Sequence, residues 1–122
     1  MVTIKKIDWL DKPTLEAIAT ITDGVYELEC FSHPCNYKPN QIFKECIYSL
    51  NSKGIVKNFD ESYFVHKQGE DFSYEITGQL KDINRGMVQV GDLIIEIEKE
   101  YIPGDIKNGD YINFCTTRLD IY

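Results

Sequence analysis

The sequence predicts an all-β, mainly antiparallel fold, and three observations carry this prediction. Apolar and polar residues alternate over several segments, which is the period of a half-buried strand. Tight-turn pairs stand between these segments at Asp23-Gly24, Pro103-Gly104 and Asn108-Gly109, where glycine tolerates the backbone that hairpins require. Gly78 and Gly91 interrupt two of the alternating segments and indicate bulges or bends.

The first hairpin is expected over residues 15–32, with Asp23-Gly24 as a two-residue loop. This register gives the inner face three pairs: Ile21 with Tyr26, Ala19 with Leu28, and Ala17 with Cys30. The outer face then carries Thr20 opposite Glu27, Ile18 opposite Glu29, and Glu16 opposite Phe31. A slip of one residue would turn both glutamates of the second strand inward, so we expect the faces to be strongly specified.

The middle of the chain, residues 35–68, fits two interpretations. Apolar residues recur at helical spacing between Ile42 and Leu50, with Asn40 as a candidate cap. Cys46, Tyr48 and Leu50 equally alternate as a strand, and a hairpin loop at residues 51–54 would then lead into a second strand. We favour the strand because the flanking residues are aromatic and β-branched, so at most one short helix is expected, within residues 40–50.

The rest of the chain alternates more regularly. A short strand is expected at residues 63–66 and a long one at 72–81, followed by a three-residue hairpin loop at Asn84-Arg85-Gly86. The return strand bends at Gly91-Asp92 and continues through residues 93–98. Two further turns lead to a strand at 111–115, and residues 118–122 are expected to form an edge strand.

Strands of this length, bent by internal glycines, suit a small, partly open antiparallel barrel, with a β-sandwich as the alternative. The long hairpin over Asp23-Gly24, the bent hairpin over Asn84-Arg85-Gly86 and the late turns at residues 103–110 resemble the oligonucleotide/oligosaccharide-binding barrel, the OB-fold. The likeness is architectural and rests on no residue motif. It implies a scaffold that binds its ligand through one sheet face and the adjoining loops.

Composition limits the class of protein. The 122 residues are 43% hydrophobic, which suits one domain over residues 1–122 with a single core. No stretch approaches the ~20 apolar residues of a membrane span, and the first residues read as a strand and not as a secretory signal, so a cytoplasmic protein with no membrane partner is expected. The 13 basic and 20 acidic residues give a net charge of −7, which disfavours nucleic acid as the partner.

No catalytic set stands out. His33 and His66 are the only histidines, and no serine-hydrolase elbow, phosphate loop or dinucleotide glycine motif is present. Four residues lie between Cys30 and Cys35, a loose spacing for a metal knuckle without a second pair, so all four cysteines are expected to be free thiols. We therefore expect a protein that is not an enzyme and needs no metal or other cofactor.

The fifteen aromatic residues are the better lead to function. Phe31 falls on the outer face of the first hairpin, and Tyr37 and Phe43 flank the ambiguous middle segment. With Ile18 and Glu29 they are predicted to form a partner-binding surface, unless the middle segment covers them as a second small core.

The expected function is thus a non-enzymatic binding module, with a protein as its partner. Binding of single-stranded nucleic acid or an oligosaccharide, as the OB-like plan implies, is the alternative. A small immunity- or inhibitor-like protein is the second alternative, on composition alone. The sequence leaves the oligomeric state open.

Overall fold

The computed structural model describes residues 1–69 and 71–122, and within them the chain is built almost entirely of strands. One 3₁₀ turn at Lys99–Tyr101 is the single helical element in the described part of the chain. The strands are β1 (Thr3–Asp11), β2 (Glu16–Thr22), β3 (Glu27–Ser32), β4 (Ile47–Leu50), β5 (Lys53–Asn58), β6 (Phe64–Lys67), β7 (Tyr74–Asp82), β8 (Met87–Val90), β9 (Leu93–Glu96), β10 (Tyr111–Thr116) and β11 (Arg118–Ile121).

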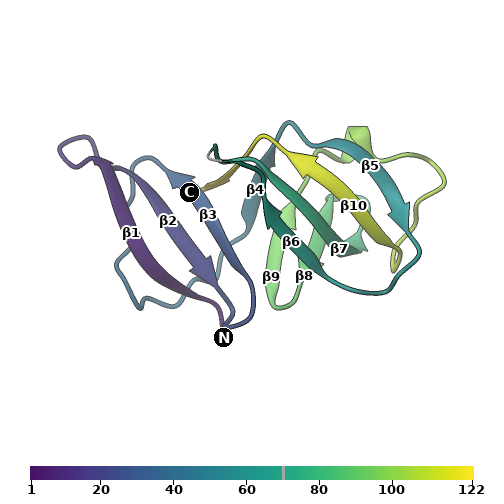
Figure 1. Cartoon of the computed structure of the whole chain (residues 1–122), viewed down its shortest axis with the longest axis horizontal. Coiled ribbons are helices and arrows are strands. Elements are labelled where there is room, and N and C mark those ends of the chain that lie inside the picture. Colours follow the sequence, from purple (N-terminus) through teal and green to yellow (C-terminus); the bar gives the residue numbers. More distant parts are fainter. Residues whose placement is uncertain (70) are drawn as a thin grey trace.

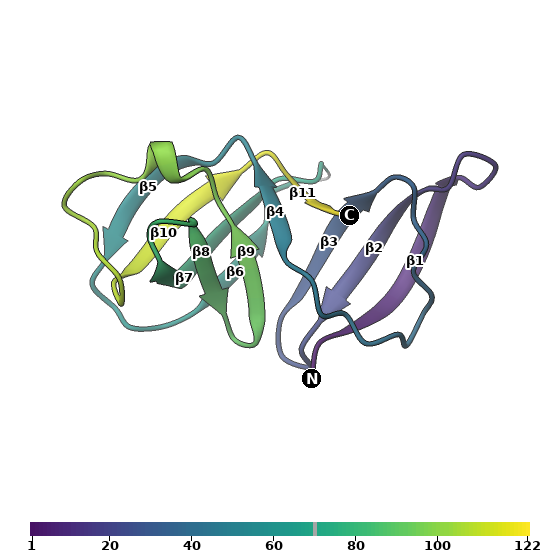
Figure 2. The same cartoon turned by 180° about the vertical axis from the view of Figure 1, so that it is seen from behind.

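All strands belong to one sheet, in the order β1-β2-β3-β11-β4-β9-β8-β7-β10-β5, with β6 beside β7. Neighbours are antiparallel except β3 with β11 and β4 with β9. Figures 1 and 2 show β1, β2 and β3 at one end of the molecule and a strongly curled region from β5 to β10 at the other. The prediction of an all-β, mainly antiparallel fold is confirmed; the sheet is curled but is not closed into a barrel.

β4 and β5 follow one another almost without a break, and so do β10 and β11. Only Asn51 and Ser52 separate β4 from β5, and only Thr117 separates β10 from β11, while β10 pairs with β5 and β11 pairs with β4. The expected hairpin loop at residues 51–54 is therefore wrong. β4 and β5 do not pair with each other; they pair in succession with β11 and β10. Residues 118–122 are likewise not an edge strand, since β11 lies between β3 and β4.

A chain of hydroxyl groups connects the β4–β5 junction to the end of β10. Ser49 Oγ lies 2.6 Å from Ser52 Oγ and donates to Thr116 Oγ1 at 2.7 Å. Ser52 in turn donates from its hydroxyl to the Glu98 carboxylate at 2.5 Å. Ser52 and Thr116 are buried, and these hydrogen bonds offset the cost of removing their hydroxyls from water.

The first hairpin has the predicted faces but not the predicted register. Ile21 pairs with Leu28 and Ala19 with Cys30, so the strands are shifted by two residues and the loop spans four residues instead of two. Asp23 explains the longer loop, because its Oδ1 accepts from the backbone N–H groups of Val25 and Tyr26 and so forms a local turn. A shift of two residues leaves each side chain on its expected face.

The middle segment contains no helix between residues 40 and 50. The strand interpretation is correct from Ile47 onward, whereas residues 40–43 follow a turn and lie alongside the beginning of β1. Ile4 N–H donates to Gln41 O at 2.8 Å, and Asn40 N–H donates to Ile4 O at 2.7 Å. Pairing with the free side of β1 satisfies these backbone groups without a helix, which overrides the helical spacing of the apolar residues.

One core runs through the whole sheet and draws on nearly every strand. Gly78 on β7 shows why a glycine interrupts this strand: a Cβ there would lie 2.6 Å from Val88 Cγ1 and 2.7 Å from the Gln89 carbonyl oxygen. The predicted left-handed glycine of the next hairpin is confirmed at Gly86, whose φ is 69°. Within the described residues no helix is long and apolar enough to span a membrane.

Candidate functional site

The structure does not bring the three predicted aromatic residues to one surface. Phe43 is only 5% exposed and belongs to the core, with the Tyr37 ring 5.5 Å from its own. Phe31 follows the buried Cys30 on β3, so its side chain points to the opposite face of that strand. The second-core interpretation therefore describes Phe43, while Phe31 lies on a separate outer surface.

Phe31 is half-buried and has a charged neighbour. The Arg118 guanidinium carbon lies 4.4 Å from the centre of the Phe31 ring, a cation–π arrangement. Arg118 also donates to both carboxylate oxygens of Asp120, at 2.7 and 3.1 Å. Phe31 thus packs against β11 through Arg118. Its role in binding a partner stays a prediction.

Of the two other predicted residues, Glu29 lines a polar groove and Ile18 is buried. Ile18 is 4% exposed and lies opposite Phe31 in the sheet, so little of it is available to a partner. Glu29 forms an ion pair with Lys67 of β6, and its backbone N–H donates to the Tyr74 hydroxyl at 2.9 Å. These contacts join β3 to β6 and β7, and burial raises the pKa of Tyr74 to about 12, so its phenol stays neutral at physiological pH.

A different surface gathers exposed apolar and aromatic side chains. Four residues on neighbouring strands lie directly opposite one another, in the order Val56 (β5), Asn113 (β10), Thr77 (β7) and Phe64 (β6). Directly opposed residues of antiparallel strands share one face of the sheet. Val56 is 54% exposed and Phe64 is 44% exposed, so large apolar groups stand at both ends of this row.

The rows on either side extend the same face. On one side Lys53, Cys115, Glu75 and His66 lie opposite one another, and on the other side Asn58, Tyr111 and Gln79 do. We call the face formed by these three rows the outer β5–β6 face. The opposite face of the same strands is buried and carries Ile55, Ile112 and Ile76.

Polar contacts hold the centre of the outer β5–β6 face in place. The Asn113 amide donates to Glu75 Oε2 at 3.1 Å and to Thr77 Oγ1 at 2.9 Å. At one margin the Tyr111 ring lies 5.8 Å from the Tyr63 ring, and at the other Phe64 stacks on His66 at 6.1 Å. The face therefore presents aromatic rings at its margins around a hydrogen-bonded polar centre.

Sequence reasoning missed this face although part of the signal was present. The alternation of Tyr111, Asn113 and Cys115 with Ile112 and Phe114 already assigned them to opposite faces of one strand. The pairing of β10 with β5 and β7, and of β7 with β6, is what brings the rows together. β10 is far from β5 and β7 in sequence, and the alternation within each strand does not indicate which strands pair.

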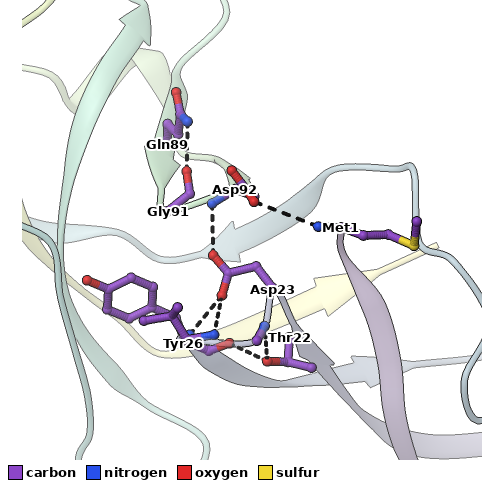
Figure 3. Close-up of polar contacts among 9 residues, drawn as sticks. Met1, Thr22, Asp23, Tyr26, Gln89, Gly91 and Asp92 are labelled. Atoms are coloured by element: carbon purple, nitrogen blue, oxygen red, sulfur yellow. Dashed lines mark hydrogen bonds and ion pairs between the residues drawn. The ribbon is translucent and has the colours of Figure 1, made fainter.

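A hydrogen bond joins the β2–β3 loop to the β8–β9 turn. Figure 3 shows Asp23, in the β2–β3 loop, beside Gly91 and Asp92 in the β8–β9 turn. Asp23 Oδ2 accepts from the Asp92 N–H at 2.9 Å, and the Met1 amino group lies 3.9 Å from the Asp92 carboxylate. Burial acts against the charge of Asp23, but backbone N–H donors, first that of Asp92, hold the pKa of its carboxyl below its usual value.

The four cysteines differ in burial. All four cysteines are free, and Cys30 and Cys35 are buried. Burial raises the pKa of the Cys30 thiol, which disfavours the thiolate that a nucleophile or metal ligand needs. Among the residues that the structure describes, no three histidine, cysteine or acidic side chains are grouped so as to hold a metal ion.

Comparison with protein-family models, curated proteins and solved structures finds no match to this chain.

Proposed function

We propose that this protein is a non-enzymatic binding module that docks a protein partner on the outer β5–β6 face. The observation that carries the proposal is the row from Val56 through Asn113 and Thr77 to Phe64, in which the two terminal side chains are large, apolar and substantially exposed. Exposed apolar groups that cluster on one face, in contrast to scattered ones, are typical of interaction sites.

The chemistry of the face favours a protein. Protein interfaces are enriched in tyrosine and phenylalanine, and they place hydrogen-bonding groups beside the apolar anchors. Tyr111, Phe64 and His66 supply rings here, and Asn113 supplies an amide already oriented by two hydrogen bonds. The net charge of −7 disfavours a polyanionic partner.

An oligosaccharide is the second candidate for the same face. Tyr111 lies directly between Asn58 and Gln79 in the sheet, so an aromatic ring has an amide side chain on either side. A ring for stacking with amides beside it is an arrangement that could also hold a sugar. The partner's chemical class decides between the two candidates.

Affinity capture with matched variants tests the proposal. The immobilised wild-type protein, a Val56→Ser/Phe64→Ser variant and a control variant are exposed to an extract of the cells that produce the protein. The control, Val25→Ser/Tyr101→Ser, removes side chains that are 78% and 56% exposed but lie outside the face, in the β2–β3 loop and in the 3₁₀ turn. We expect a specific protein to be retained by the wild type and the control, and at least tenfold less by the face variant.

Two results would contradict the proposal. One is retention of the same proteins, in the same amounts, by all three forms. The other is failure of the wild type to retain any protein while it binds purified oligosaccharides, with that binding lost in the face variant; this would establish the second candidate. Circular dichroism of each variant confirms that the sheet is intact.

A further inference from the structure

β1 is an edge strand that is covered over only part of its length. It pairs with β2 on one side, and on the other side residues 40–43 cover its beginning through the hydrogen bonds at Val2 and Ile4. From residue 5 to residue 11, no described part of the chain pairs with the free side of β1. Such an edge presents unpaired backbone groups that can accept another strand.

The free part of this edge also exposes apolar side chains. Trp9 is 38% exposed and Leu10 is 52% exposed, and they lie on opposite faces of β1 because they are neighbours. Lys6 and Asp8 precede them on the strand and, being two residues apart, lie on one face of it. An incoming strand would therefore find backbone groups, apolar contacts and two opposite charges within one short segment.

We infer that β1 pairs antiparallel with β1 of a second copy, about a two-fold axis at Ile7. A two-fold axis perpendicular to a sheet keeps each face on its own side, so residues that share a face must lie opposite one another. With the axis at Ile7, residues 5–9 of the two copies lie opposite one another, and the pairing ends before Ile4, whose free side residues 40–43 already cover. Within this stretch Lys6 of each copy lies opposite Asp8 of the other, and the two ion pairs form by symmetry. The inference concerns a different surface from the outer β5–β6 face and does not depend on the proposed function.

The charges select this register over its neighbours. An axis at Lys6 would place the two Lys6 side chains opposite each other, and an axis at Asp8 would oppose the two Asp8 side chains. Like charges directly opposite across a strand pair are destabilising. The axis at Ile7 also lies between the irregularities at Ile4/Lys6 and Trp9/Asp11, within the regular part of the strand.

Local complementarity has to overcome the repulsion between two chains of net charge −7 each, so the dimer is expected to form only as concentration rises. Lys6 and Asp8 can therefore be substituted to test dimerisation. Both side chains are more than half exposed, and their ion pair within one chain, at 3.6 Å, is a surface contact that contributes little to folding.

A charge-exchange experiment by sedimentation velocity tests the inference. Wild-type protein is expected to approach twice the monomer mass as its concentration rises. Lys6→Asp places acidic side chains at both positions 6 and 8, and Asp8→Lys places basic side chains at both, so each variant alone is expected to stay monomeric. An equimolar mixture of the two variants restores opposite charges at both positions and is expected to form the heterodimer.

Lys107→Asp, which makes the same charge change in an exposed loop, is the control and is expected to dimerise as the wild type does. The inference is overturned if the wild type stays monomeric at the highest attainable concentration, or if either charge variant alone dimerises as well as the wild type. It is also overturned if the mixture of variants remains monomeric. Recovery in the mixture would show at the same time that both variants are folded.

Discussion

At the residue scale, Asp23 acts as a hydrogen-bond acceptor between two parts of the sheet that are remote in sequence. One carboxylate oxygen accepts two N–H groups of its own loop, and the other accepts the N–H of Asp92 (Figure 3). The ionised carboxylate therefore stabilises the folded state relative to the unfolded state. This is the physical meaning of its lowered pKa.

Because the pKa of Asp23 is lower in the folded state, its stabilising effect is present above the unfolded value and is lost as pH falls through the folded value. We expect Asp23→Ala to lower the free energy of unfolding by about 1–2 kcal/mol at neutral pH, the scale of hydrogen bonds to a charged group. The difference from wild type should shrink when urea unfolding is repeated below about pH 4.

Asp105→Asn is the matched control for this prediction, because Asp105 is exposed in a turn and its removal changes the net charge by the same amount. It should change the free energy of unfolding by less than about 0.5 kcal/mol at any pH. An Asp23 variant as stable as wild type at neutral pH would contradict the role assigned to its carboxylate.

Phe31 and Phe43 make a second prediction at this scale. Phe43 is nearly fully buried, so Phe43→Ala should cost about 3–5 kcal/mol of the free energy of unfolding. Phe31 is half-buried against Arg118, and Phe31→Ala should cost clearly less, about 1–2 kcal/mol. Urea unfolding of the two variants side by side decides this, and equal costs would show that both rings belong to the core.

At the scale of elements, the β8–β9 turn depends on Gly91. Its φ of 58° is left-handed, and a Cβ there would lie 2.3 Å from Asp23 Oδ2 and 3.0 Å from the Tyr26 ring. Gly91→Ala should therefore destabilise the protein by about 2 kcal/mol through backbone strain and displacement of Asp23. Thermal and urea unfolding measure this effect.

Gly104→Ala is the control for Gly91, since no atom lies within 4 Å of a Cβ at position 104. It should leave the free energy of unfolding within about 0.5 kcal/mol of wild type. Combining Gly91→Ala with Asp23→Ala should cost less than the sum of the two, because the smaller side chain makes room for the methyl group. Strict additivity would contradict the contact.

The elements also show how far sequence reasoning reaches. Alternation assigned the faces of β2, β3, β7 and β10 correctly, because the two-residue period is a local property. It did not give the register of the first hairpin, where the Asp23 carboxylate favours a four-residue loop over the two-residue turn that Asp-Gly usually forms. Nor did it show that residues 40–43 would pair with β1, which removed the helical alternative.

At the scale of the whole molecule, the order of strands was the part beyond reach. The sequence indicated an all-β chain, and the structure agrees. The expected bend of one strand at Gly91-Asp92 is wrong, because Val90 pairs with Leu93, and Gly91 and Asp92 form the turn of the β8–β9 hairpin. The pairing of β11 with β3 and of β10 with β5 depends on contacts between distant segments, which no local pattern records. The surfaces depend on the same distant pairings: Phe43 lies in the core while Phe31 lies on an outer surface, and Val56 and Phe64 stand at the two ends of a row that four strands build together.

The most direct test of the proposed binding face is an NMR titration of the isotope-labelled protein with the partner that affinity capture yields. Amide signals of the outer rows on β5, β6, β7 and β10 should shift or broaden on binding, and signals around Phe31, Arg118 and Asp120 should not. The same partner should leave the spectrum of the Val56→Ser/Phe64→Ser variant unchanged. Perturbations centred on Phe31 and Arg118, with the outer β5–β6 face unaffected, would contradict the account.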